Sequence, residues 1–177
     1  FSFDHIFTQD TASKTLLNSI GYTAVTVSGD TRFDRVGNQL KTNNTLDFIA
    51  EFKAQKTCVV AGSTWPEDES LLIDYINRSA DDTKFIIAPH NMDLNQIKSL
   101  VKQLKKPTVL YSNYANETLN DKTVFIVDTI GLLSKIYSYA DIAYVGGGMG
   151  TSGLHNTLEA ATFGLPIVIG KNYKKFP

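Results

Sequence analysis

The stretch that decides the fold runs from Ile142 to Phe163 and reads IAYVGGGMGTSGLHNTLEAATF. Its first four residues are continuously apolar, which is typical of a strand covered on both faces in a parallel sheet. A glycine-rich loop follows, and apolar residues three and four apart from Leu154 to Phe163 then predict a helix. Strand, glycine loop and helix together indicate one unit of an α/β fold with a parallel sheet.

The same alternation extends over most of the chain. Other short β-branched runs lie at 25–27, 58–61, 85–88, 108–111, 124–127 and 167–169, and helical spacing recurs at 67–79, 94–104 and 130–139. We therefore predict a Rossmann-like parallel sheet of about six strands with helices on both faces. The run at 25–27, together with the strand-like residues 5–9, predicts a separate strand-helix-strand unit at the start of the chain. The polar, Asn-rich stretch from Gly37 to Thr45 indicates a linker or surface turn.

Composition limits the function classes. The 177 residues suffice for one domain, and 42% of them are hydrophobic, as in ordinary globular proteins. Lys and Arg number 17 against 18 Asp and Glu, so no basic surface favours nucleic acid. No apolar stretch approaches the roughly 20 residues of a membrane-spanning helix. The lone Cys58 lies in an apolar run and is expected to be a buried, inert thiol. The ends, Phe1 and Pro177, indicate an excised part of a longer protein.

A ligand site is expected where the strands end, because parallel α/β sheets bind ligands outside their carboxyl ends. Four loops there are polar or glycine-rich. The residues that we expect to converge on one cleft are Ser63, His90, Gly131, Gly148, Asn156 and Glu159. His90 is either a cleft residue or a surface loop residue, and Trp65 is expected to pack locally against the helix that it precedes.

The glycine loop predicts a phosphate site, since glycines allow backbone N–H groups to approach an anion and a helix from Leu154 would point its positive end there. A tight turn without ligand is the alternative. On that helix Asn156 and Glu159 would share a face, where the Glu159 carboxylate could accept hydrogen bonds from two ribose hydroxyls. Alternatively, Glu159 only complements the helix dipole. His155 is expected at the helix start, in contact with phosphate or backbone.

Other motifs do not fit. No acid follows Glu159, so the dinucleotide fingerprint lacks its ribose-binding residue. Gly170-Lys171-Asn172 lacks the hydroxyl of a Walker A loop, and Leu154 stands where a hydrolase nucleophile elbow needs glycine. His155 and Glu159 could share a metal, but no third ligand has suitable spacing, so no metal site is predicted.

A series of motifs carries a resemblance to a known family. In chain order it comprises Gly29–Asp34, Gly62–Glu69, Ala88–His90, Asp128–Gly131, Ala140–Gly148, His155–Glu159 and Gly164–Pro166. The series resembles the C-terminal half of 3-deoxy-D-manno-octulosonic acid (Kdo) transferases and spans nearly the whole chain. The glycine loop with its His-Asn-x-x-Glu segment also occurs in other glycosyltransferases of the two-domain GT-B architecture.

The resemblance implies an inverting, metal-independent enzyme without cofactor that moves Kdo from CMP-Kdo to a lipid A precursor, on the cytoplasmic side of the bacterial inner membrane. It implies that residues 1–36 are the tail of an N-terminal acceptor domain and that 37–177 form an incomplete donor domain. The general base would lie in the missing half, so this chain would hold no catalytic residue and be inactive alone.

By the same resemblance, CMP contacts fall on Pro89, His90, Ile130, Gly131, Leu132, Asn156, Thr157, Leu158 and Glu159, and the donor phosphate or sugar lies near Ser63, Thr64, Gly147, Gly148 and His155. Two residues depart from the family pattern, which usually has Arg at His90 and Glu at Leu132. His carries only part of a positive charge at neutral pH. A UDP-sugar transferase, a UDP-sugar epimerase and a non-catalytic sugar-nucleotide-binding module remain alternatives.

Overall fold

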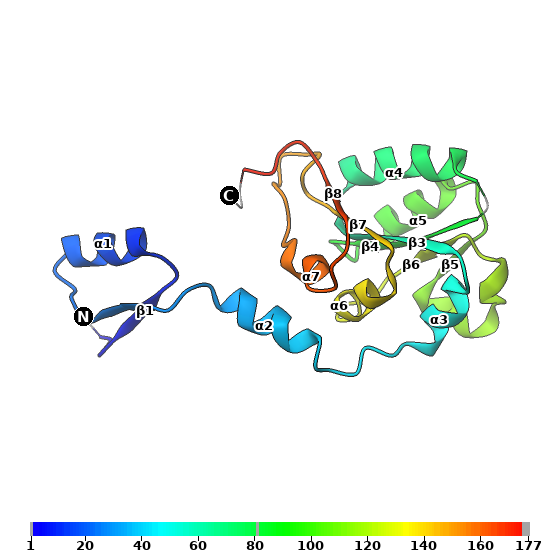
Figure 1. Ribbon diagram of the computed structural model, residues 1–177. Coiled ribbons are helices and arrows are strands. Elements are labelled where there is room, and N and C mark those ends of the chain that lie inside the picture. Colours follow the sequence, from blue (N-terminus) through cyan, green and yellow to red (C-terminus); the bar gives the residue numbers. More distant parts are fainter. Residues whose placement is uncertain (1, 81, 175–177) are drawn as a thin grey trace.

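The computed structural model describes residues 2–80 and 82–174, and within them the main body is a six-stranded parallel sheet in the order β5-β6-β4-β3-β7-β8 (Figure 1). The two chain ends noted above lie outside the described residues. The strands are β3 (Thr57–Thr64), β4 (Thr83–Pro89), β5 (Thr108–Leu110), β6 (Val124–Ile126), β7 (Ile142–Val145) and β8 (Ile167–Ile169). This confirms the predicted parallel sheet.

Helices cover both faces of the sheet. On one face lie α4 (Pro66–Arg78) and α5 (Leu94–Gln103), and on the other α3 (Asp47–Lys53), α6 (Leu133–Ile136) and α7 (Leu158–Ala161). Successive residues of a strand point to opposite faces. Val60 accordingly packs into the core with α3 and α6, whereas the next residue, Ala61, packs into the core with α4 and α5. Short 3-10 helices lie at Tyr111–Asn116, Leu119–Asp121 and Tyr137–Tyr139.

The opening unit forms as predicted, with β1 (Ile6–Thr8), α1 (Thr11–Ser19) and β2 (Val25–Val27) in a two-stranded parallel sheet of its own. Helix α2 (Thr31–Gln39) joins this unit to the main body, where it contacts α7 (Figure 1). Asp30 caps α2 by accepting a hydrogen bond from the Arg32 N–H at 2.9 Å, and Val36 is buried. The predicted linker was therefore wrong at Gly37–Gln39, which form the last turn of a helix.

Two predicted helices are shorter than expected. The segment after the glycine loop becomes helical only at Leu158, because the N–H of His155 donates to the Gly146 carbonyl at 3.0 Å and the N–H of Leu154 to the Asn172 carbonyl at 3.3 Å. These bonds tie Leu154 and His155 to distant backbone groups instead of to a helix. Helix α6 begins only at Leu133, since Gly131 has a φ of +92°, which no right-handed helix accommodates.

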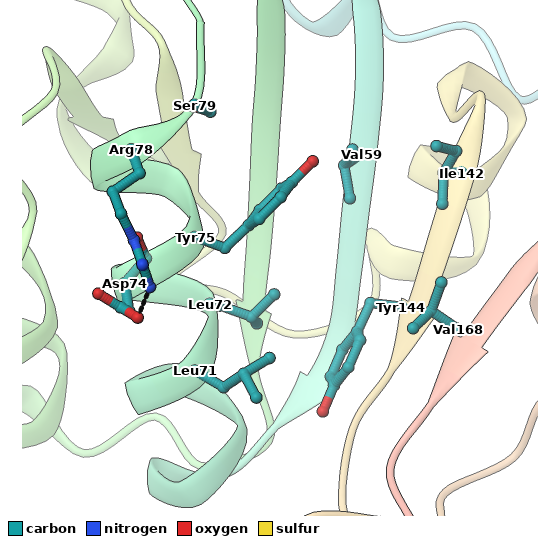
Figure 2. A pocket seen from close by; sticks show the side chains of 10 residues that line it. All are labelled: Val59, Leu71, Leu72, Asp74, Tyr75, Arg78, Ser79, Ile142, Tyr144 and Val168. Atoms are coloured by element: carbon teal, nitrogen blue, oxygen red, sulfur yellow. Dashed lines mark hydrogen bonds and ion pairs between the residues drawn. The ribbon is translucent and has the colours of Figure 1, made fainter.

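An apolar cavity of about 760 Å³ lies beside α4, over the strands β3, β7 and β8 (Figure 2). Leu71 and Tyr75 of α4 face Val59, Tyr144 and Val168 of the strands across it. None of its lining residues comes from the loops at the carboxyl ends of the strands. This groove is thus separate from the site that the topology predicts.

Candidate functional site

The sheet has its topological switch point between β3 and β7. From β3 the chain continues to β4 on one side, whereas β7 pairs with β3 on the other side. Ligands of open parallel sheets bind where the strand order reverses in this way. The ends of β3 and β7 therefore mark the centre of the candidate site.

The end of β3 is strained. Ser63 has a φ of +55°, and the register with β4 shifts between Gly62 and Thr64. A left-handed conformation is uncommon for a serine and is found preferentially at functional sites. Thr64 does not face the cleft as predicted, because it is fully buried and its hydroxyl donates to Glu69 at 3.1 Å. Ser63 remains the residue of this pair that is partly exposed.

The glycine loop encloses a carboxylate of its own chain. The N–H of Gly147 donates to Asp68 Oδ2 at 2.7 Å, and the N–H of Met149 donates to Asp68 Oδ1 at 3.3 Å. Gly147 and Gly148 are both buried. A Cβ on Gly150 would lie 2.8 Å from the Glu67 carboxyl carbon, so a second carboxylate lies against the loop.

The prediction that this loop cradles a ligand phosphate was therefore wrong for the amides of Gly147 and Met149, which already bind an internal anion. The helix that was expected to point its N-terminus at the loop does not do so either, because α7 begins only at Leu158. The glycines are required by close backbone approach instead. A Cβ on Gly146 would lie 2.3 Å from the Ser63 carbonyl oxygen, and one on Gly148 would lie 2.9 Å from Gly170.

Three aromatic rings stack beside the switch point. His90 lies on Trp65 with ring centroids 5.0 Å apart and on His155 with centroids 4.3 Å apart. Trp65 Nε1 donates to His155 Nε2 at 2.7 Å, which requires that nitrogen of His155 to be unprotonated. Trp65 thus contacts two distant loops, and the prediction of purely local packing was wrong. His155 is not a helix-start residue, and His90 is exposed on the outer side of the stack.

Six of the nine predicted nucleotide contacts divide between two cavities that helix α2 also lines. The first, of about 260 Å³, is lined by Ile130, Gly131, Leu133, Ser134 and Glu159 with Arg35, Val36 and Gln39 of α2. The second, of about 330 Å³, is lined by Asn156, Thr157 and Leu158 with Gln9, Asp10, Asp30, Arg32 and Phe33.

Asn156 and Glu159 do not share a helix face as predicted, because Asn156 precedes α7. Its side-chain oxygen accepts a hydrogen bond from the Leu158 N–H at 3.1 Å. Leu132 packs against the core, so its side chain does not line the cavity of Glu159. Pro89 is the last residue of β4 and is buried, whereas its neighbour His90 is exposed.

Tyr137 connects the first cavity with the switch point. Burial, with a smaller effect of the Glu159 charge, raises the pKa of the Tyr137 hydroxyl. A Cβ on Gly62 would lie 2.1 Å from the Tyr137 hydroxyl oxygen, so any larger residue at that position of β3 would displace the Tyr137 side chain. Glu159, Tyr137 and the end of β3 therefore belong to one region of the carboxyl edge.

Sequence reasoning missed Asp68, Tyr137 and the α2 residues Arg35 and Gln39. Asp68 could have been noticed because it belongs to an acidic run directly after a strand end, whereas Gly37 made the segment of α2 look like a turn.

Cys58 is buried, and its burial raises the pKa of the thiol to about 12, as expected of an inert cysteine. Across the described ranges, no three His, Cys, Asp or Glu side chains gather as metal ligands would. Within the same ranges no helix has the length and apolar character needed to span a bilayer.

Strand order and helix packing together define a doubly wound parallel α/β domain whose switch point lies between β3 and β7. Comparison with known proteins confirms the resemblance to Kdo transferases. The chain is 32% identical over 136 residues to the 3-deoxy-D-manno-octulosonic acid transferase of Chlamydophila psittaci, covering 74% of this chain and 31% of that protein. It is 27% identical over 179 residues to the Haemophilus influenzae enzyme of the same name, covering 97% of this chain and 42% of that protein.

A bifunctional glycosyltransferase/methyltransferase of Fusobacterium nucleatum is 34% identical over 113 residues, which cover 63% of this chain and 18% of that protein. No family model matches the chain. In each of these three comparisons, the chain spans less than half of the length of the curated relative. Among solved structures, the C-terminal CMP-Kdo binding domain of WaaA from Acinetobacter baumannii aligns with a TM-score of 0.62 at 23% identity, covering 83% of this chain and 75% of that domain. This likeness confirms the fold.

Proposed function

We propose that this chain is the donor-binding part of a glycosyltransferase that moves Kdo from CMP-Kdo to a lipid A precursor in lipopolysaccharide biosynthesis. The observation that carries the proposal is the similarity to Kdo transferases along 97% of the chain, which includes the switch-point loops and α7. The structural neighbour, a CMP-Kdo binding domain, supports the same donor.

In this proposal the nucleoside occupies the cavity of Ile130, Gly131 and Glu159. Gly131 is exposed and has a left-handed backbone, so its peptide groups can meet a base at close range. The partly exposed Glu159 carboxylate accepts hydrogen bonds from ribose hydroxyls, which are charge-assisted and stronger than neutral ones. Arg35 and Gln39 of α2 close the cavity from the other side.

The proposed chemistry is loss of CMP from the donor as the acceptor hydroxyl attacks. Negative charge grows on the CMP phosphate as the glycosidic bond breaks, and groups that are fixed in advance stabilise it. Ser63 and His90 lie at the switch point, where that phosphate would be held. We propose that the reaction inverts the configuration of the sugar and needs no metal ion. The general base lies in an N-terminal acceptor domain, of which residues 1–36 are the tail. That domain meets the lipid at the inner membrane.

Calorimetric titration of the chain with CMP, UMP and UDP tests the donor. We expect CMP to bind, with UMP and UDP weaker by about tenfold or more, because a site that hydrogen-bonds the base edge rejects a base with altered donors and acceptors. Preference for UDP would instead support a UDP-sugar transferase or epimerase.

An assay with CMP-Kdo and a lipid A precursor tests whether transfer also needs the proposed N-terminal domain. We expect no transfer by residues 1–177, because the base and the acceptor site belong to the other domain. Transfer by this chain alone would contradict that part of the proposal.

A further inference from the structure

We infer that Asp68 is a positioning residue of the donor site, an internal anion that holds the glycine loop and the aromatic stack in their binding shape. The inference rests on the proposed function. Asp68 is completely buried, and its two carboxylate oxygens accept four hydrogen bonds. The donors are Gly147 N at 2.7 Å, Met149 N at 3.3 Å, Trp65 N at 3.0 Å and the Tyr144 hydroxyl at 2.7 Å.

These four donors explain how a carboxylate can be buried at this place. A buried charge is costly unless it is paired or hydrogen-bonded, and a carboxylate offers about four acceptor positions. All four are used. Burial, followed by the hydrogen bond to Asp68, raises the pKa of the Tyr144 hydroxyl, so this group stays a donor. Asp68 therefore needs no ligand of its own and works by fixing the groups around it.

The groups that Asp68 fixes come from both sides of the switch point. Through the Trp65 N–H it holds the loop after β3, and through the Gly147 and Met149 N–H groups it holds the loop after β7. The second loop leads to His155, whose N–H donates back to the Gly146 carbonyl at 3.0 Å. The side chains of Trp65 and His155 meet only if both loops keep these positions. The Asp68 carboxylate thus fixes the positions of Trp65 and His155, the two rings on which His90 stacks.

Asp68→Asn tests the inference with little change in size. The amide puts an N–H₂ group where an oxygen now faces two donors, so at least one loop must move. Hydrogen exchange of the Gly147 and Met149 amides should accelerate by about tenfold or more, as expected when hydrogen bonds to a charged group are lost. The fluorescence of Trp65, the single tryptophan, should shift. CMP affinity should fall by about tenfold or more.

Glu69→Gln is the matched control, since Glu69 is also buried but bonds Thr64 and Gln96 rather than the glycine loop. It should leave the Gly147 exchange rate, the Trp65 emission and the CMP affinity as in the wild type. Asp68→Ser is a second variant, which removes both carboxylate oxygens and adds no bulk. If Asp68→Asn does not fold, Asp68→Ser should still accelerate exchange at Gly147 and Met149, whose N–H groups now donate to Oδ2 and Oδ1.

The outcomes separate the inference from the proposed function. Unchanged exchange and emission in a folded Asp68→Asn protein, or in Asp68→Ser where the first variant does not fold, would overturn the role of Asp68. So would unchanged CMP affinity. A wild-type chain that does not bind CMP would overturn the proposed function, and faster exchange in Asp68→Asn would then still support Asp68 as the anchor of both loops.

Discussion

Replacing Glu159 by glutamine should weaken CMP binding far more than it affects folding. Glu159 lies in the first turn of α7 and lines the cavity shared with Gly131. Its carboxylate can accept a hydrogen bond from each of two ribose hydroxyls, whereas glutamine keeps one good acceptor. Hydrogen bonds to a charged group are worth about 1.5–3 kcal/mol, so the loss corresponds to roughly 10- to 100-fold in affinity.

The competing interpretation assigns Glu159 to the helix dipole alone. An acid in the first turn of an exposed helix contributes about 0.3–1 kcal/mol to stability, and α7 has only four residues, which puts this contribution at the lower end. The substitution would then change the free energy of unfolding slightly and leave CMP affinity unchanged. The two interpretations differ in which quantity changes.

The assay pairs calorimetric CMP titration with thermal denaturation of wild type and Glu159→Gln. Glu51→Gln, an exposed acid on α3, is the control and should alter neither quantity appreciably. An affinity within about twofold of the wild type, together with a lowered melting temperature, would refute the ribose contact. A twofold change in affinity is smaller than the loss of one hydrogen bond to a charged group would cause.

Further predictions concern the scaffold of the site. Gly147→Ala should destabilise the chain by about 2 kcal/mol or more in denaturant unfolding, because its φ is +87° and a Cβ would lie 2.3 Å from the Gly153 carbonyl oxygen. Gly37→Ala, in a helix with open space around it, should instead stabilise by up to about 1 kcal/mol, and equal effects of the two would contradict the geometry. Burial alone would raise the pKa of Asp141, but Lys53 at 2.9 Å and the Cys58 N–H at 2.8 Å hold it below 3.8. A lowered pKa stabilises the fold above the unfolded value, so the stability difference between wild type and Asp141→Asn should shrink as the pH falls through and below 3.8. A difference independent of pH would rule out this ion pair as the cause.

The sheet could be predicted from the sequence because its strands are short apolar runs, although the edge strand β8 leaves Val168 and Ile169 exposed. The runs at 25–27, 142–145 and 167–169 match β2, β7 and β8 at both ends. Helix α3 was missed, and it is only seven residues long, too short for a periodicity to stand out.

The site was less predictable, because its details depend on contacts between distant residues. Periodicity continued the last helix back to Leu154, but the N–H groups of Leu154 and His155 donate to the Asn172 and Gly146 carbonyls, and this segment is not helical. The glycine loop was expected to bind an external anion, whereas Asp68, 79 residues earlier than Gly147, supplies an internal one. Such a partner is visible only once the ends of β3 and β7 are brought together.

A crystal structure of the chain with CMP tests the central claim most directly. The proposed function predicts that the ribose hydroxyls lie within hydrogen-bond distance of the Glu159 carboxylate, with the base beside Gly131 and the phosphate near Ser63 and His90. The Gly147 and Met149 N–H groups should stay on Asp68. A nucleotide that binds in the apolar groove beside α4, or whose phosphate takes the glycine-loop amides from Asp68, would contradict it.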